Sequence, residues 1–223
     1  MLANVFLHEV LDVWFETVVK PRLRGRARLV RYADDATLVF EREDDARRVW
    51  SVLPKRFAKY GLTLHPEKTR LIAFQRPRHG TRNGDQGRDA QPESFEMLGF
   101  THYWSRSMRG YWVVKRKTAH ARMTRALRAV TQWCRRNRHA PVAWQHAQLG
   151  RKLRGHYGYY GITGNSVWIT RFRHEVRRIW RKWLDRRGGR RGMPWPRFAL
   201  LEERYPLPAA IAVHSIYRRA ANP

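Results

Sequence analysis

Two adjacent carboxylates, Asp34 and Asp35, stand in the middle of the apolar, β-prone segment 29–40, LVRYADDATLVF. Short runs rich in Val, Tyr, Thr and Phe on both sides of an Asp-containing break predict a β-hairpin with the acids at its tip. Strand alternation places Tyr32 and Asp34 on one face and makes Asp35 the first residue of the return strand. Two oxygen donors there could hold Mg²⁺ against a polyphosphate. An Asp-Asp pair is also a common polar turn, so the surrounding sequence must decide.

Two amphipathic helices should support this hairpin. Apolar residues at helical spacing predict the first helix over 3–19, ended by Pro21. Its expected buried stripe is Leu7, Val10, Leu11, Trp14, Phe15 and Val18. A second helix should begin near Asp44 and end at Gly61, with a kink at Pro54. Its expected stripe is Ala46, Val49, Trp50, Leu53 and Phe57.

The chain from residue 62 to residue 114 alternates between strand-like and loop-like patterns. Short strands are predicted at 62–64 and 71–74, and the Gly-, Pro- and Arg-rich stretch 76–94 predicts a mobile surface loop. A hairpin should follow, with arms at 103–104 and 111–114.

Charge divides the 223-residue chain into two parts. It has 46 Lys and Arg against 18 Asp and Glu, and 25 of these basic residues lie in 101–200 beside only two acids, Glu175 and Asp185. Such an excess favours a polyanionic partner. The single cysteine, Cys134, excludes a disulfide framework and a cysteine-cluster zinc site. No apolar run is long enough for a membrane span, so we expect a cytoplasmic, intracellular protein without membrane contact.

From Lys115 onward the pattern becomes helical and basic. Apolar stripes that include Met123 and Val130, then Trp144 and Leu149, and then residues 172–184 predict successive helices. A Pro-rich end should pack back through Phe198, Leu200 and Leu201. Cations on the other faces could contact phosphates, and exposed aromatic rings could stack on unpaired bases. The candidate nucleic-acid-binding residues are Arg122, Arg125, Arg128, Arg151, Lys152, Arg154, Tyr157, Tyr159, Arg177, Arg178 and Arg181.

The aromatic residues of this half have two interpretations. For Trp180 and Trp183 core packing is favoured, because both lie on the apolar face of their helix. For Tyr157, Tyr159 and Tyr160, core packing and base stacking are equal alternatives.

Three groups of residues occur in the order and spacing of reverse-transcriptase palm blocks. They are Tyr32-Ala33-Asp34-Asp35, then Gly61-Leu62-Thr63-Leu64 with Glu67-Lys68-Thr69, and then Phe95 with Leu98-Gly99-Phe100. Segment 2–7, LANVFL, resembles the tail of the block that precedes them in the family. The resemblance implies that Asp34 and Asp35 are two of three metal-binding aspartates and that Lys68 lies near the incoming triphosphate. It also makes 95–100 the primer-grip region.

The second half resembles the maturase region, domain X, of group II intron-encoded proteins. The resemblance rests on residues 151–161, RKLRGHYGYYG, with Asn165-Ser166, and on the closing segment 213–223, VHSIYRRAANP. It implies an α+β protein: the C-terminal part of a reverse-transcriptase palm over 1–114, followed by a basic α-helical thumb and maturase region over 115–223.

The resemblance also implies the function and its limits. The intact protein would copy intron RNA into DNA with Mg²⁺, and would bind group II intron RNA, assist its splicing and engage a DNA target or primer. The family's third catalytic aspartate, fingers and nucleotide-binding residues precede the block that 2–7 resembles. We therefore expect no or very weak polymerase activity from this chain alone. A second copy, or an N-terminal half in trans, remains open as a partner. The alternatives are a non-enzymatic RNA-binding splicing factor with a palm remnant, and a generic basic nucleic-acid-binding protein.

Overall fold

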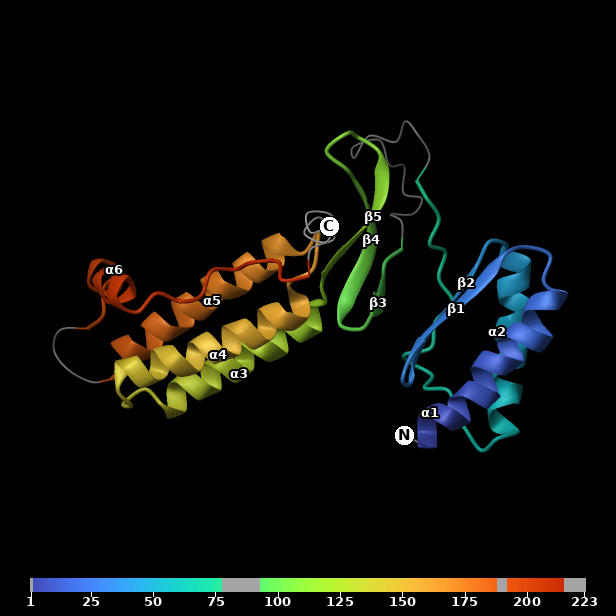
Figure 1. The fold of residues 1–223 in the computed structure, drawn as a ribbon, viewed down its shortest axis with the longest axis horizontal. Coiled ribbons are helices and arrows are strands. Elements are labelled where there is room, and N and C mark those ends of the chain that lie inside the picture. The colour runs from blue at the N-terminus through green and yellow to red at the C-terminus, as the bar shows by residue number, and fades with distance from the viewer. Residues whose placement is uncertain (1, 78–92, 188–191, 215–223) are drawn as a thin grey trace, which may run out of the picture. The chain divides into compact units, whose positions relative to one another are not determined.

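The computed structural model describes residues 2–77, 93–187 and 192–214. The chain divides into two compact units, Met1–Leu98 and Gly99–Pro223 (Figure 1). Most of the loop predicted at 76–94 lies outside the described residues, so its mobility stays a prediction. None of the described helices is long and apolar enough to span a membrane.

The first unit opens with one continuous helical run of changing geometry. It comprises α1 (Leu2–Leu7), the π-helical η1 (His8–Val13) and η2 (Phe15–Val19) joined through Trp14, and the 3₁₀ turn η3 (Lys20–Arg22). The helix predicted over 3–19 is present, but the run continues through Pro21, which lies within the 3₁₀ turn.

The π geometry corrects the predicted buried stripe at one position. Val10, Leu11, Trp14 and Phe15 are buried as expected, whereas Val18 is 39% exposed and Val19 takes its place in the core. A π-helix bonds i to i+5, so each turn is wider than the α-helical turn used for the prediction. The buried face therefore advances one residue further by the end of the run.

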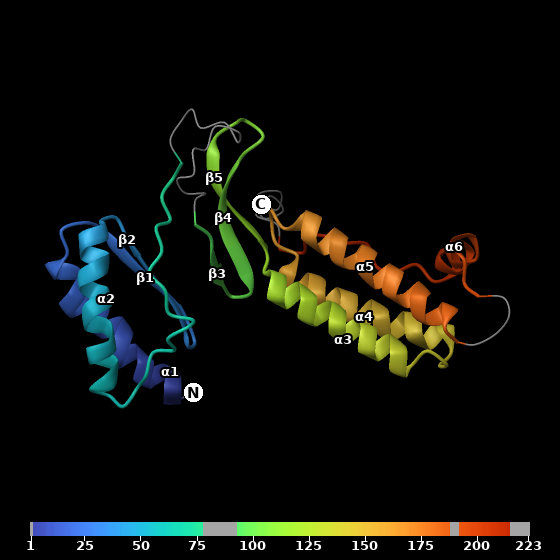
Figure 2. The same ribbon diagram turned by 180° about the vertical axis from the view of Figure 1, so that it is seen from behind.

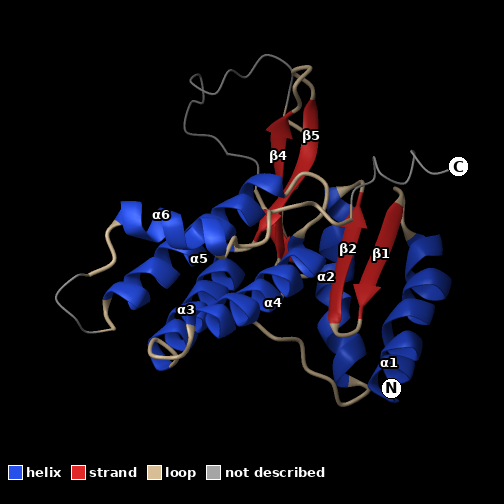
Figure 3. Ribbon diagram, turned by 60° about the vertical axis from the view of Figure 1, so that its left-hand side comes forward, coloured by secondary structure: helices blue, strands red, loops and turns tan. Residues whose placement is uncertain are grey.

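A β-hairpin packs on this helical run (Figure 3). Strands β1 (Ala27–Tyr32) and β2 (Asp35–Phe40) pair antiparallel, with Tyr32 opposite Asp35. On β1 the inward and outward residues alternate strictly, and Leu29, paired with Leu38, faces the core. The hairpin is therefore confirmed, but Asp35 rather than Asp34 shares a face with Tyr32. The chain reverses one residue earlier than the alternation assumed, through Ala33 at φ 55°.

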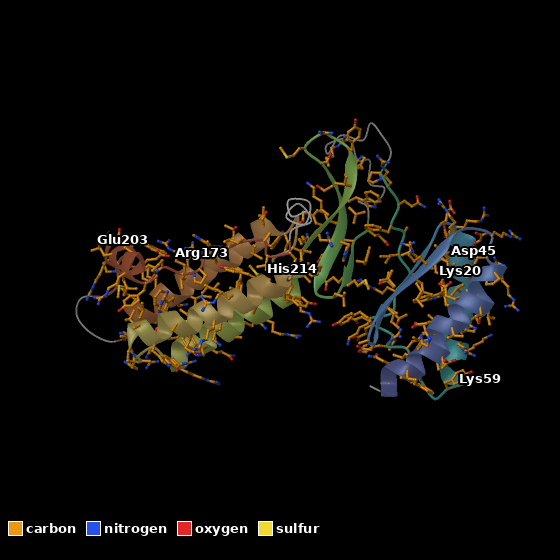
Figure 4. All side chains as sticks on the ribbon, viewed as in Figure 1. Lys20, Asp45, Lys59, Arg173, Glu203 and His214 are labelled. Atoms are coloured by element: carbon orange, nitrogen blue, oxygen red, sulfur yellow. The ribbon has the colours of Figure 1, made fainter. Side chains whose placement is uncertain are left out.

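Helix α2 (Glu43–Ala58) covers the same core through Val49, Leu53 and Phe57, and Pro54 lies within it. Trp50, expected in that stripe, is 39% exposed. The carboxylate of Asp45, labelled in Figure 4, is buried and accepts hydrogen bonds from the Arg24 and Gly25 amides at 2.9 and 2.8 Å. It therefore joins the start of α2 to the residues just before β1.

The prediction of short strands at 62–64 and 71–74 is wrong. Both segments are irregular in the structure. Leu62 and Leu64 nevertheless pack on the core of the first unit, so their apolar pattern reflects burial rather than strand pairing.

A second sheet has the order β3–β4–β5 and comprises β3 (Phe95–Met97), β4 (Phe100–Arg106) and β5 (Trp112–Thr118). Strands β4 and β5 form the predicted hairpin, but its register runs from Phe100 opposite Thr118 to Arg106 opposite Trp112. The helical pattern expected from Lys115 is therefore wrong over 115–118, where alternating basic residues continue a strand.

Four helices complete the second unit (Figures 1 and 2): α3 (His120–Arg136), α4 (Val142–Tyr160), α5 (Ser166–Asp185) and α6 (Trp195–Arg204). Their core contains Leu149, Phe172, Trp180 and Phe198 with little or no exposed area. Two expected core residues instead lie at the surface, Trp144 at 43% and Leu200 at 68% exposed.

Two buried side-chain amides form hydrogen bonds with backbone groups at opposite ends of this bundle. Asn165 accepts the Thr118 amide at 2.9 Å and donates to the Thr118 hydroxyl and the Tyr160 carbonyl. Gln145 accepts the indole N–H of Trp180 at 3.0 Å and donates to carbonyls of the α3–α4 turn, including that of Asn137. Buried polar groups need such partners, so both amides fix how the elements meet.

Replacing Asn165 with alanine should destabilise the protein by roughly 2–3 kcal/mol, because the buried Thr118 amide would lose its acceptor. The free energy of unfolding from urea titrations, followed by far-UV circular dichroism, measures the loss. The neighbouring exposed Ser166→Ala variant is the control and should match the wild type. Equal stability of Asn165→Ala and the wild type would contradict this role.

Candidate functional site

The two predicted metal ligands lie at the turn of the first hairpin. Asp34 occupies the two-residue turn with Ala33, and Asp35 begins β2 opposite Tyr32. Both carboxylates are exposed, and within the described residues neither forms an ion pair or a side-chain hydrogen bond. Their oxygen atoms are therefore available to a cation or a solvated ligand.

An arginine clamp holds the hairpin turn in place. The Arg31 guanidinium donates to both carboxylate oxygens of Asp12, at 2.7 and 2.6 Å, and to the carbonyl oxygen of Ala33 at 2.8 Å. The paired side chains are only 15% and 23% exposed, and the bidentate geometry is the stronger form of this interaction. Asp12 belongs to η1, so the clamp ties the turn that carries Asp34 to the helical run.

The sequence patterns do not single out Asp12. Its carboxylate also contacts the imidazole of His8 at 3.1 Å, one turn earlier. The signal was an acid placed directly after the buried Leu11, where an unpaired carboxylate would be costly. The arginine that neutralises it lies on β1 and could not be assigned without the fold.

The donor set fits one Mg²⁺ ion better than two. Mg²⁺ is commonly bound by one or two carboxylates together with waters and substrate phosphates, and Asp34 with Asp35 supply that number. No cluster of three or more His, Cys, Asp or Glu side chains that could hold a metal is found in the described ranges. A two-metal arrangement needs further ligands beyond these two residues.

Lys68 lies in the turn 66–68, where its amide donates to the carbonyl of His65 at 3.2 Å. The side chain is exposed and has no ion pair with the described acids. A contact with a triphosphate therefore remains a prediction for this residue.

The predicted nucleic-acid-binding cations fall into two groups. On α3 and α4 the basic residues are exposed, and no acid accompanies them because 120–160 contains no Asp or Glu. They are Arg122, Arg125, Arg128, Arg151, Lys152 and Arg154. This surface, which we call the α3–α4 basic surface, is available to phosphates.

The α5 arginines are instead used within the protein. Arg177 pairs with Glu202 at 2.6 Å, Arg178 pairs with Glu175 at 3.3 Å, and Arg181 donates to the Met193 carbonyl at 2.8 Å. Arg173, labelled in Figure 4, likewise donates to the Pro208 carbonyl at 3.1 Å. Arg173, Arg177 and Arg181 fasten α6 and the segments on either side of it to α5, so reversing their charge would disturb packing as well as any ligand. Arg178 differs, because its partner lies within α5 and its side chain is exposed.

The two candidate tyrosines differ in exposure. Tyr157 is 3% exposed, its hydroxyl donates to the Pro208 carbonyl at 3.3 Å, and burial raises its pKa to about 12. This placement favours the packing interpretation. Tyr159 is 53% exposed and stacks on Phe100 with ring centroids 6.0 Å apart. Trp180 is fully buried and Trp183 partly buried, as the core interpretation predicted.

Comparison with known families bears on the first unit and the start of the second. Residues 1–102 match the family Reverse transcriptase (RNA-dependent DNA polymerase). The reverse-transcriptase match contains the Asp34–Asp35 turn, the Asp12–Arg31 clamp and Lys68. No match was found among curated proteins or among solved structures.

The Asp12–Arg31 clamp should make the stability of the first unit depend on pH. Its hydrogen bonds from Arg31 lower the pKa of Asp12 below its usual value near 3.8, against the opposing effect of burial. A carboxyl group whose pKa is lower in the folded state stabilises the fold when the pH is above its unfolded-state pKa. This stabilisation is lost as the pH falls toward the folded-state pKa. Asp12→Asn should therefore cost roughly 1–2 kcal/mol at pH 7 and less below about pH 4.

Urea titrations of the wild type and of Asp12→Asn between pH 3 and pH 7 measure this convergence. Glu16→Gln is the matched control, because Glu16 forms only an exposed pair with Lys20 on the same helical run. A stability difference between wild type and Asp12→Asn that stays constant with pH would contradict the assignment.

Proposed function

We propose that this chain carries the late palm segment and the maturase region of a group II intron reverse transcriptase. The intact protein would copy intron RNA into DNA and would bind the intron RNA to assist its splicing. The observation that carries the proposal is the Asp34–Asp35 turn, exposed at a hairpin tip inside a segment that matches reverse transcriptases. The maturase part rests on the resemblance of 151–166 and 213–223 and on the α3–α4 basic surface.

The geometry of the first unit supports a role in nucleotidyl transfer. Bound Mg²⁺ would supply charge stabilisation to the transferring phosphoryl group. Asp34 and Asp35 would hold the ion, while the Asp12–Arg31 clamp keeps their turn in one position. Positioning of this kind by neighbouring residues is what such sites require.

The second unit supports RNA binding through charge. Helices α3 and α4 and the turn between them carry nine Lys and Arg between residues 120 and 160 without a neutralising acid. Neutralising phosphates with such side chains releases counterions and provides most of the non-specific affinity. Recognition of a structured intron RNA would add shape and unpaired bases to this electrostatic contribution.

A non-enzymatic RNA-binding splicing factor is the second candidate. The observation in its favour is the small donor set, since the described residues bring only two carboxylates to the turn. Primer extension with Mg²⁺ and deoxynucleotides should give no or very weak synthesis by this chain alone under both candidates. Robust synthesis that depends on Asp34 and Asp35 would overturn that expectation and exclude the splicing factor.

The RNA-binding part is tested by the salt dependence of affinity. We expect tighter binding to a group II intron RNA than to an unrelated RNA of equal length and base composition at moderate salt. Charge reversal at Arg122, Arg125 and Arg128 should reduce the slope of log affinity against log salt by about 2 to 3, because each phosphate that is no longer neutralised lowers the slope by roughly 0.7–0.9. Filter binding between 50 and 300 mM salt measures both quantities.

Asp34→Asn with Asp35→Asn is the control for this measurement and should leave RNA affinity unchanged. Equal affinity of the wild type for both RNAs would remove the maturase proposal and leave a generic basic nucleic-acid-binding protein. An unchanged salt slope in the triple arginine variant would exclude this face of α3 as the RNA site.

The metal part is tested with Mn²⁺ as a spectroscopic substitute for Mg²⁺. Replacing both Asp34 and Asp35 with asparagine should weaken Mn²⁺ binding by about tenfold or more, because both charged ligands are lost. Electron paramagnetic resonance of free Mn²⁺ measures the bound fraction. Glu43→Gln is the matched control, since Glu43 is an exposed acid that pairs with Arg47. Equal Mn²⁺ binding by the control and the double variant would contradict the assignment.

A further inference from the structure

Two tryptophans from different helices stack at the end of the bundle where α3 turns into α4. The rings of Trp133 and Trp144 have centroids 5.7 Å apart and planes inclined by 23°. Trp133 is partly buried and packs against the core of the bundle. Trp144 is 43% exposed, although a large apolar ring gains from burial. One ring is therefore anchored, and it holds the other at the surface in a fixed orientation.

Cations lie beside Trp133 and elsewhere on the two helices that carry the pair. The Lys152 ammonium lies 5.4 Å from the centre of the Trp133 ring. Arg136 follows Trp133 by one helical turn, so both lie on the same side of α3. Arg136 also lines an open hollow of about 470 Å³ together with Gln132, Arg135, Arg138 and His139. A phosphate group could enter this hollow and find positive charge on several sides.

Other exposed aromatic rings of the second unit differ in what they contact. Trp195 is 41% exposed, but the guanidinium groups of Arg181 and Arg177 lie 4.4 and 4.8 Å from its ring centre. These arginines are themselves held by the Met193 carbonyl and by Glu202. Trp195 is therefore covered by the protein's own cations. Among the described residues, the cation contact at the Trp133–Trp144 pair falls on the anchored ring, Trp133, and not on Trp144.

We propose that Trp144 is a stacking platform for an unpaired base of single-stranded nucleic acid. Arg135, Arg136 and Lys152 bind the phosphates on either side of that base. A flat aromatic ring stacks on any base, and adjacent cations follow the backbone, so the chemistry fits RNA and DNA alike. The absence of acids between residues 120 and 160 makes the surface complementary to a polyanion along its whole length. This inference rests on the proposed nucleic-acid binding by the second unit and assigns a specific subsite to it.

The experiment uses the full chain and three probes: a 12-nucleotide single-stranded RNA, the DNA strand of the same sequence, and the corresponding blunt RNA duplex. Each single strand carries one 2-aminopurine, whose fluorescence is quenched by stacking. Trp144→Ala should weaken single-strand binding about 5- to 100-fold and relieve the quenching, because one stacked base is lost. Duplex binding should change less than about twofold, since its bases are already paired.

Two further variants guard against indirect effects. Trp144→Phe keeps a ring and should retain most of the affinity and the quenching. Trp195→Ala removes a tryptophan of similar exposed fraction whose ring already contacts Arg177 and Arg181. It should leave single-strand binding unchanged. Thermal unfolding checks that each variant folds. If Trp144→Ala does not fold, a loss of quenching in Trp144→Leu with Trp144→Phe unaffected supports the platform equally.

The outcomes distinguish this inference from the proposed function. Binding of intron RNA and single strands that is indifferent to Trp144→Ala overturns the platform and leaves the proposed function standing. Equal loss on the duplex also overturns the platform. A wild-type chain that binds neither intron RNA nor single strands removes both. Loss on RNA and DNA together assigns the site to base and phosphate alone, and loss on RNA only adds the ribose hydroxyl to the recognition.

Discussion

Scarcity of negative charge is the constraint on which the second unit depends. Its described residues carry only Glu175, Asp185, Glu202 and Glu203 against a large excess of Lys and Arg. Few ion pairs can therefore hold the bundle together, the Arg177–Glu202 pair among them. Other arginines of α5 donate to backbone carbonyls such as those of Pro208 and Met193. The bundle is further stabilised by burial of apolar side chains and by the buried side-chain amides of Gln145 and Asn165. The cations that find no internal acceptor are left on α3 and α4, where they define the surface offered to a polyanion.

In the first unit the candidate functional groups are negatively charged carboxylates, those of Asp34 and Asp35. Two adjacent carboxylates in a tight turn repel each other and need a rigid support. Arg31 supplies it by directing its charge to Asp12 and a further N–H to the Ala33 carbonyl. The guanidinium thus fixes the backbone of the turn without neutralising Asp34 or Asp35. Support and ligand are kept on separate side chains, which leaves the ligands free for a metal.

Much of the fold could be predicted from local patterns, and the failures have physical causes. The hairpin, α2 and α5 follow from strand alternation and helical spacing, which depend only on neighbouring residues. A 3.6-residue period predicts Val18 in the core, because that period does not encode π-helical turns. The sequence predicts a helix at 115–118 because alternating basic residues in a strand resemble the basic face of a helix. Whether an arginine is used internally or left at the surface depends on distant carbonyls, such as that of Pro208, which lies 35 residues from Arg173.

The core of the helical bundle is completed by residues that come late in the chain. Phe198 and Leu207 are almost fully buried among side chains of α3, α4 and α5. During synthesis the chain emerges at roughly 5–20 residues per second, so these three helices leave the ribosome before their last core residues emerge. For about a second or more an apolar groove faces a cell rich in RNA and chaperones. Translation rate over this stretch therefore influences the yield of folded protein independently of its final stability.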